Sequence, residues 1–132
     1  MEEIRKHAIA LLVLIYKLQR EGLRFEWALD ERLAQMAREM NVDEKDARLL
    51  AEIIFKKLLN EAFEKNDPVP EMDEGKMGEV AYAYLQWIMR RDGIRLKADL
   101  RRRVGSTAKD IGISTDEMVE FTKILVREGF DL

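Results

Sequence analysis

The residues of this sequence that are best suited to chemistry form a basic cluster late in the chain. Between Arg90 and Lys109 there are eight Lys or Arg and two Asp, a local balance of +6 in a chain whose net charge is −3. Such a segment can contact the phosphates of DNA or RNA, or the carboxylates of an acidic partner. The alternative is a solvated helix face, because consecutive arginines spread around most of a helical turn. The basic residues are Arg90, Arg91, Arg95, Lys97, Arg101, Arg102, Arg103 and Lys109.

The side chains that most enzymes use for catalysis are scarce. The chain has no cysteine, and its single histidine, His7, cannot complete a zinc site without Cys ligands. Its two serines, Ser106 and Ser114, lie in no nucleophile-elbow pattern. Gly105 follows three arginines but has no companion glycines, so we interpret it as a kink or break in a helix rather than as part of a phosphate-binding loop. The sequence therefore predicts no enzyme, no catalytic residue and no metal or cofactor.

The most apolar stretch, AIALLVLIY at Ala8–Tyr16, raises the question of a membrane segment. It has nine residues, whereas a spanning helix needs about 20. No basic region precedes it and no small-residue cleavage site follows it. We therefore expect a cytoplasmic protein without a membrane partner. The lack of cysteine and the abundance of Lys, Arg and Glu fit that expectation, and they are also typical of heat-adapted proteins.

The helices that position these residues are encoded by two similar segments of the sequence. REGLRF at Arg20–Phe25 returns as RDGIRL at Arg91–Leu96, 71 positions later. At this offset, 10 of the 60 pairs from Glu2/Asp73 to Glu61/Leu132 are identical without a gap. A helical apolar stripe also repeats in register. We therefore predict an internal duplication, with chance similarity between amphipathic helices as the alternative. The stripe is Phe25, Leu29, Leu33, Met36 and Met40 in the first copy, and Leu96, Leu100, Val104, Thr107 and Ile111 in the second.

The helix boundaries are marked by the same chemistry in both copies. Gly22 and Gly93 each stand where a helix ends, because glycine accepts a positive φ. At the end of the next helix in each copy stand Asn41 and Gly112, which tolerate the left-handed conformation. The N-caps that follow are Asp43 and Ser114, each with an acid three residues on.

These boundaries predict three helices in each copy. The first three cover about residues 4–21, 26–40 and 43–64, and the second three cover about 78–91, 97–111 and 114–128. We see no strand pattern. The predicted organisation is one three-helix repeat at 1–64, a linker at 65–76 that holds both prolines, and a second three-helix repeat at 77–132.

The junction of the second and third helices has a distinctive pattern. AKDIGISTDEMVEF at Ala108–Phe121 has a small residue, Ala108, then Gly112 four positions later, then a capped helix with an apolar face. AREMNVDEKDARLL is its counterpart in the first copy. This pattern resembles the helix-turn-helix of bacterial and archaeal regulators. The resemblance implies two helices packed across a tight turn. In DNA-binding members the second helix reads the major groove, but here its first turn carries Asp116 and Glu117, which phosphates repel. We therefore favour a packing scaffold over a base reader.

The first helix of each copy is apolar on every side, which exceeds what a three-helix unit can bury. We predict that these two helices supply the contact between the copies, and that the surplus forms a homodimer or partner surface at Ile15, Tyr16, Tyr84 and Trp87. The fold class is thus all-α, with two tandem helix-turn-helix-like halves packed into one helical body. The predicted function is a non-catalytic protein-interaction or regulatory module. The alternative is a nucleic-acid-binding helix-turn-helix regulator that uses Arg90–Lys109.

Overall fold

The computed structural model describes residues 1–21, 33–92 and 104–130, and every regular element within these ranges is an α-helix. The four long helices are α1 (Glu3–Glu21), α3 (Glu44–Ala62), α4 (Glu74–Asp92) and α6 (Thr115–Gly129). Two further helical stretches cover 33–39 and 104–111. The predicted all-α class is therefore confirmed. None of the helices in the described part of the chain is long and apolar enough to cross a membrane.

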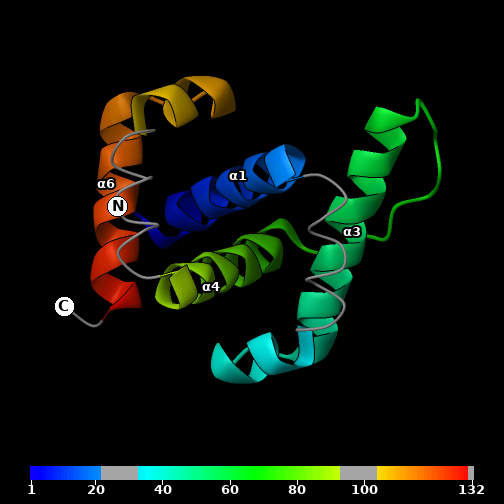
Figure 1. The fold of residues 1–132 in the computed structure, drawn as a ribbon, viewed down its shortest axis with the longest axis horizontal. Helices are drawn as coiled ribbons and strands as arrows, with labels where there is room; N and C mark the ends of the chain where they lie inside the picture. The colour runs from blue at the N-terminus through cyan, green and yellow to red at the C-terminus, as the bar shows by residue number, and fades with distance from the viewer. Residues whose placement is uncertain (22–32, 93–103, 131–132) are drawn as a thin grey trace.

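Helices α1 and α4 form the centre of the molecule. Figure 1 shows them between α6 and α3, which lie on opposite sides of the pair. The most extensive contact between the long helices is the one between α1 and α4, and α4 also packs against both α6 and α3. The predicted contact between the two apolar first helices is thus confirmed. Because α3 and α6 both cover the same central pair, the described helices share one core.

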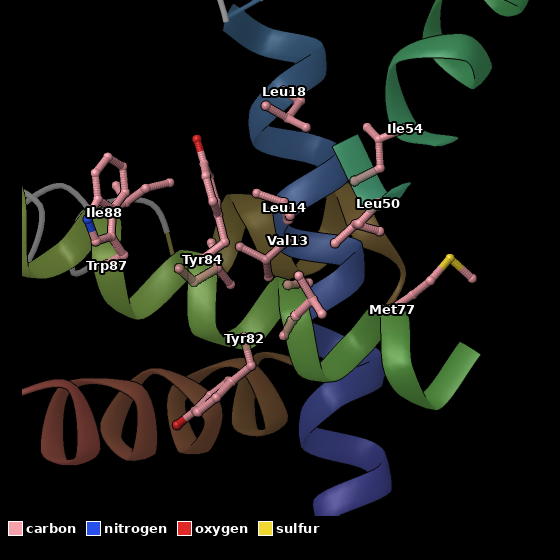
Figure 2. Close-up of a cluster of buried hydrophobic side chains, with 14 of the residues drawn as sticks. Val13, Leu14, Leu18, Leu50, Ile54, Met77, Tyr82, Tyr84, Trp87 and Ile88 are labelled. Carbon is pink, nitrogen blue, oxygen red and sulfur yellow. The ribbon is translucent and has the colours of Figure 1, made fainter. Parts of the chain in front are cut away.

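The core is built from the inward faces of these helices. Figure 2 shows Leu14 and Leu18 of α1 beside Leu50 and Ile54 of α3. These four residues and Tyr84 of α4 line one small apolar hollow. On the other side of α4, Phe121 of α6 is fully buried and packs edge-on against Tyr82. Burial of this apolar surface is the main stabilising contribution to the fold.

Small residues let α1 and α4 approach closely. Ala10 and Ala81 are fully buried. A Cβ atom on Gly78 would lie 2.6 Å from the carbonyl oxygen of His7, which is closer than real contacts permit. His7 and Gly78 are themselves counterparts at the offset of 71, as are Ala10 and Ala81. His7 and Gly78 therefore meet where the two helices cross. There is room at this crossing for the side chain of His7 but not for a side chain at position 78.

The element boundaries recur at the offset seen in the sequence. Helices α1 and α4 each have 19 residues, and their starts and ends differ by 71 positions. The left-handed residues also correspond, with φ of 56° at Asn41 and 80° at Gly112. Just after each, the N–H of Val42 or Ile113 donates to a carbonyl five residues earlier, which closes the helix end. The predicted left-handed positions are confirmed.

The predicted N-caps are also confirmed. The Asp43 side chain accepts a hydrogen bond from the Lys45 N–H at the start of α3. The Ser114 hydroxyl accepts one from the Glu117 N–H at the start of α6, over 3.1 Å. Each bond satisfies a helix N–H that has no partner within the helix.

Two boundary predictions were wrong. Helix α4 begins at Glu74 rather than at Gly78, because the Asp73 side chain accepts a hydrogen bond from the Lys76 N–H and caps the helix early. Because α3 ends at Ala62, the segment between the two helices is 63–73, where the sequence predicted a linker at 65–76. Residues 104–111 are helical throughout, so Gly105 does not break the helix there. Gly22, Gly93 and the first parts of the helices predicted at 26–40 and 97–111 lie outside the described residues.

Candidate protein-interaction surfaces

Two of the predicted interface residues, Tyr16 and Trp87, bind acids on distant helical stretches of the same chain. The Tyr16 hydroxyl donates to the Asp110 carboxylate over 2.9 Å. The Trp87 indole N–H donates to the Glu39 carboxylate. Tyr16 and Trp87 are counterparts at the offset of 71, and so are Glu39 and Asp110. The first bond therefore joins α1 to the helical stretch 104–111, and the second joins α4 to the helical stretch 33–39.

An arginine accompanies each of these aromatic rings. The Arg20 guanidinium lies 5.7 Å from the Tyr16 ring centre and donates to its hydroxyl, while Arg91 lies 4.8 Å from the Trp87 ring centre. Arg20 and Arg91 are again 71 positions apart. Such cation–π contacts add to the hydrogen bonds. Tyr16 and Trp87 thus stabilise the protein's own fold.

The other two predicted interface residues also contact the core. Tyr84 is buried beside Trp87, with ring centres 5.9 Å apart. Ile15 is half-buried and packs against the core. Of the four predicted interface residues, therefore, only Ile15 and Tyr16 have substantial solvent-accessible area.

The basic segment is described only at its two ends. The Arg90 Nε donates to the Gly129 carbonyl over 2.6 Å, so Arg90 holds the last turn of α6. Arg91 stacks on Trp87, and Lys109 is exposed. Arg95, Lys97, Arg101, Arg102 and Arg103 lie outside the described residues. Arg90 and Arg91 therefore make contacts within the chain, although both of them, like Lys109, are exposed.

The helix that would read DNA in the resemblance carries an acidic first turn that is already engaged. Glu117 of α6 makes a two-pronged ion pair with Arg5 of α1, over 2.7 and 2.9 Å. This hydrogen bonding lowers the pKa of Glu117 and raises that of Arg5. At the counterpart positions, Asp46 of α3 pairs with Lys76 of α4 over 3.5 Å. Both first turns therefore contribute to contacts within the chain.

A buried lysine that the sequence analysis missed links α1, α4 and α6. Lys6 is 5% exposed, and its ammonium donates to Glu3 over 2.9 Å and to Glu128 over 3.3 Å. It also lies 4.4 Å from the ring centre of Tyr82, whose hydroxyl donates to Glu128. Burial, and then the Glu128 charge, raise the Tyr82 pKa above its ordinary value. Every polar group of this cluster has a partner, so its role is structural.

An open apolar groove lies between the end of α1 and the second half of α3. Its volume is about 470 Å³, and Leu18 and Gln19 of α1 form one wall. The side chains that form the α3 wall recur at the spacing of one helix face over two helical turns. Phe63, at the end of this wall, is 61% exposed, an unusual exposure for a large aromatic residue. This wall consists of Phe55, Leu58, Leu59, Glu61 and Ala62 of α3 and its C-cap residue Phe63.

At one pair of counterpart positions between α4 and α6, the corresponding space is filled. Gly129 stands where α3 has Leu58, and Met89 stands where α1 has Leu18. A Cβ on Gly129 would lie 2.1 Å from the Met89 methyl carbon, so the absence of a side chain lets Met89 fill this space. Arg90 then binds the Gly129 carbonyl. The Leu18–Leu58 contact lines an open groove, whereas the Met89–Gly129 contact is filled.

The outward face of α1 continues this apolar surface. Ile4 is 83% exposed and Leu12 is 38% exposed, with exposed Ala8 between them. Ile15 follows on the same face, and Gln19, one turn further, lines the groove. The counterpart face of α4 carries Gly75, Glu79, Ala83, Gln86 and Arg90 instead. The sequence predicted the surplus apolar area on the two central helices, α1 and α4. Among the described residues, the exposed large apolar side chains are Met1, Ile4 and Leu12 at or in α1, Phe63 just after α3 and Phe130 just after α6.

The described residues hold no group of His, Cys, Asp or Glu that could bind a metal ion. No protein-family profile matches this chain, and no curated protein or solved structure shows a significant match. The function must therefore be inferred from the surfaces alone.

Proposed function

We propose that this protein is a non-catalytic interaction module that binds another protein in the groove between α1 and α3. The observation that carries the proposal is the exposed apolar wall of α3, which ends at Phe63 with 61% of its surface in water. Leaving such side chains exposed costs free energy of solvation, and contiguous apolar patches on a protein surface are typical of binding sites.

We further infer that the chain consists of two tandem three-helix halves, residues 1–64 and 77–132, joined by a linker and built on the helix-turn-helix-like packing described above. Matching helix starts, caps and left-handed residues support this inference. The paired contacts Tyr16–Asp110 and Trp87–Glu39 support it as well, because they relate the halves by exchange. In this view each half supplies stabilising contacts to the other, and a regulatory partner would bind the two packed halves together.

The alternative, a nucleic-acid-binding regulator, gains no specific support from the described residues. Asp116 and Glu117 occupy the first turn of the would-be recognition helix, and Glu117 is bound to Arg5. Carboxylates at these positions would oppose DNA phosphates. The test of the proposed function must therefore also be able to detect binding of nucleic acid.

The test compares capture by the wild-type chain with capture by Ala62→Arg, in nuclease-treated extract. Ala62 is exposed and lines the groove, so an arginine there fills the groove without disturbing the core. Ala34→Arg is the matched control, because Ala34 is also exposed in a helical stretch but does not line the groove. We expect a protein that binds the wild type and Ala34→Arg but not Ala62→Arg. Capture that survives Ala62→Arg, or that disappears with nuclease, would contradict the proposal.

A further inference from the structure

We propose that this protein also binds an extended, basic segment of a partner protein beside the segment 63–73, on a surface separate from the α1–α3 groove. A second groove, the linker groove, lies between α3, the segment 63–73 and the start of α4. Its volume is about 600 Å³, and the two grooves have no described lining residue in common. The shape, the backbone and the charge of the linker groove each constrain what it binds.

Hydrogen bonds and an ion pair hold the walls of the linker groove in place. The Asn60 amide of α3 donates to the Asp67 carbonyl over 3.0 Å, and its oxygen accepts from the Asp67 N–H over 3.2 Å. Lys76 of α4 pairs with Asp46 of α3 over 3.5 Å. Figure 1 shows the segment 63–73 turning back along α3 before it reaches α4. The groove is therefore formed in the free protein, which lowers the cost of ordering a binding site.

Part of the linker groove is lined by apolar side chains. Ile53 and Met77 are buried, whereas Val69, Pro70 and Met72 are half-buried. Transfer of an apolar side chain from water to such a site is favourable, and methionine adapts its shape to different occupants. We therefore expect the partner segment to place a large apolar side chain here.

The backbone of residues 68–72 favours an extended occupant. Pro68 and Pro70 fix their own φ and hold the residue before each of them in an extended conformation. Within the described part of the chain, residues 68–72 make no backbone–backbone hydrogen bond. Val69 and Glu71 keep their N–H groups and stand two positions apart, the spacing at which a strand presents its groups along one edge. An extended peptide can pair with such an edge, whereas a helix has already used its own backbone groups.

The linker groove carries an excess of negative charge. Its described lining includes the carboxylates of Glu71, Asp73 and Glu74 and one basic side chain, Lys57. Residues 63–79 contain six Asp or Glu and two Lys, so the local balance with Lys57 included is −3. Such an excess attracts the Lys and Arg side chains of a partner and orients them.

The carboxylates of Glu71 and Glu74 are available to a partner. Both are exposed, and neither side chain makes a hydrogen bond or ion pair within the described part of the chain. Lys76 does not neutralise them, because its ammonium lies 3.5 Å from Asp46 and 3.9 Å from Glu79. The described residues also hold no group of acids arranged to share a metal ion. The geometry therefore favours separate cationic side chains on either side of the apolar one.

The test uses four labelled synthetic peptides of equal length, whose binding to the full chain is measured by fluorescence anisotropy at low salt. The first has a central Leu flanked by Lys on both sides, and the second has Glu in place of Lys. We expect the Lys peptide to bind about tenfold more tightly than the Glu peptide, because each surface ion pair contributes modestly. Replacing the Leu by Gly should weaken the Lys peptide about tenfold, since the apolar contact is lost. In the fourth peptide, N-methylation of the central amides of the Lys peptide should also weaken binding, because it removes the backbone donors.

Variants connect this binding to the linker groove. Glu71→Gln combined with Glu74→Gln should weaken the Lys peptide about three- to tenfold and narrow its advantage over the Glu peptide. Both side chains are exposed, so we expect the double variant to keep its fold. Glu61→Gln is the matched control, because Glu61 is an exposed acid that lines the α1–α3 groove instead. We expect Glu61→Gln and Ala62→Arg to leave binding of the Lys peptide unchanged.

The inference would be overturned if the Lys peptide did not bind, if it bound no better than the Glu or the Gly peptide, or if its affinity were unchanged in the double variant. An N-methylated peptide that binds as tightly as the unmodified one would also overturn it, as would self-association of the wild-type chain that the double variant removes. If Ala62→Arg abolishes peptide binding and the double variant does not, the peptide occupies the α1–α3 groove, so this inference fails and the proposed function stands. If the peptide results hold but capture from extract does not depend on Ala62, the proposed function fails and this inference stands.

Discussion

The α1–α3 contact at Leu18 and Leu58 and the α4–α6 contact at Met89 and Gly129 occupy counterpart positions in the chain, but they are packed differently. At the first contact, the open side, Leu18 and Leu58 line a groove whose apolar wall extends to Phe63. At the second contact, the closed side, Met89 packs into the space that Gly129 leaves. The comparison shows that a glycine lets a side chain of the neighbouring helix fill a space that stays open where leucine stands instead.

A second difference reinforces the first. Lys6 fastens α1 to Glu128 of α6, but its counterpart on α4 is Met77 and the counterpart of Glu128 is Lys57. Helix α6 is thus held by a polar cluster as well as by Phe121, while no equivalent lysine–glutamate pair can form at the counterpart positions on α3 and α4. The two sides therefore differ both in shape and in the interactions that fix the outer helix.

The largest expected effect concerns the helix crossing that both sides share. Gly78→Ala would place a Cβ 2.6 Å from a backbone oxygen of α1, and a helix backbone cannot move aside cheaply. We expect a loss of about 3 kcal/mol in the free energy of unfolding, measured by denaturant titration. A loss below about 0.5 kcal/mol would mean that α1 and α4 do not approach each other closely.

The next effect targets the closed side alone. Gly129→Ala forces the buried Met89 methyl group to move, so we expect a destabilisation of about 1–2 kcal/mol. Gly105→Ala is the matched control, because a Cβ there meets nothing within 4 Å. Alanine is the better helix former, so the control should gain about 0.5–1 kcal/mol. If both variants changed stability equally, the explanation of the closed side would be wrong.

The caps test whether the two sides are built alike. Ser114→Ala and Asp43→Ala each remove a side-chain acceptor from the first turn of α6 or α3. We expect each change to cost about 1 kcal/mol in the free energy of unfolding. A clear cost for one variant and none for the other would show that one of the two helix starts has been misassigned.

The smallest effect is a dependence on pH. Because the Arg5 hydrogen bond holds the Glu117 pKa below its ordinary value of 4.5, this pair stabilises the fold above pH 4.5. The contribution is lost as the pH falls through the lowered pKa. We expect Glu117→Gln to show a shallower loss of stability than the wild type below pH 4.5, in denaturant titrations at a series of pH values. Identical pH profiles for the two proteins would contradict the pairing.

The sequence predicted local structure well and the binding surface poorly. Asn41, Gly112, Asp43 and Ser114 act through their immediate neighbours, so their roles were legible from residue type and spacing. Lys6 was not identified, because its partner Glu128 lies 122 positions away. The apolar pattern of the sequence could show that α3 has more apolar residues than are required to bury one face of the helix. Which of them stay exposed depends on how closely α3 approaches α1, and this depends on packing across the whole molecule.

The most direct test of the central claim is hydrogen exchange of the full chain with and without its captured partner, followed by mass spectrometry. The account predicts added protection at the end of α1 around Leu18 and Gln19 and along the second half of α3 through Phe63. Peptides around Gly129 in α6 should show no change. Protection confined to α6, or to the segment from Arg90 to Lys109, would contradict the claim that the open α1–α3 groove is where this protein binds.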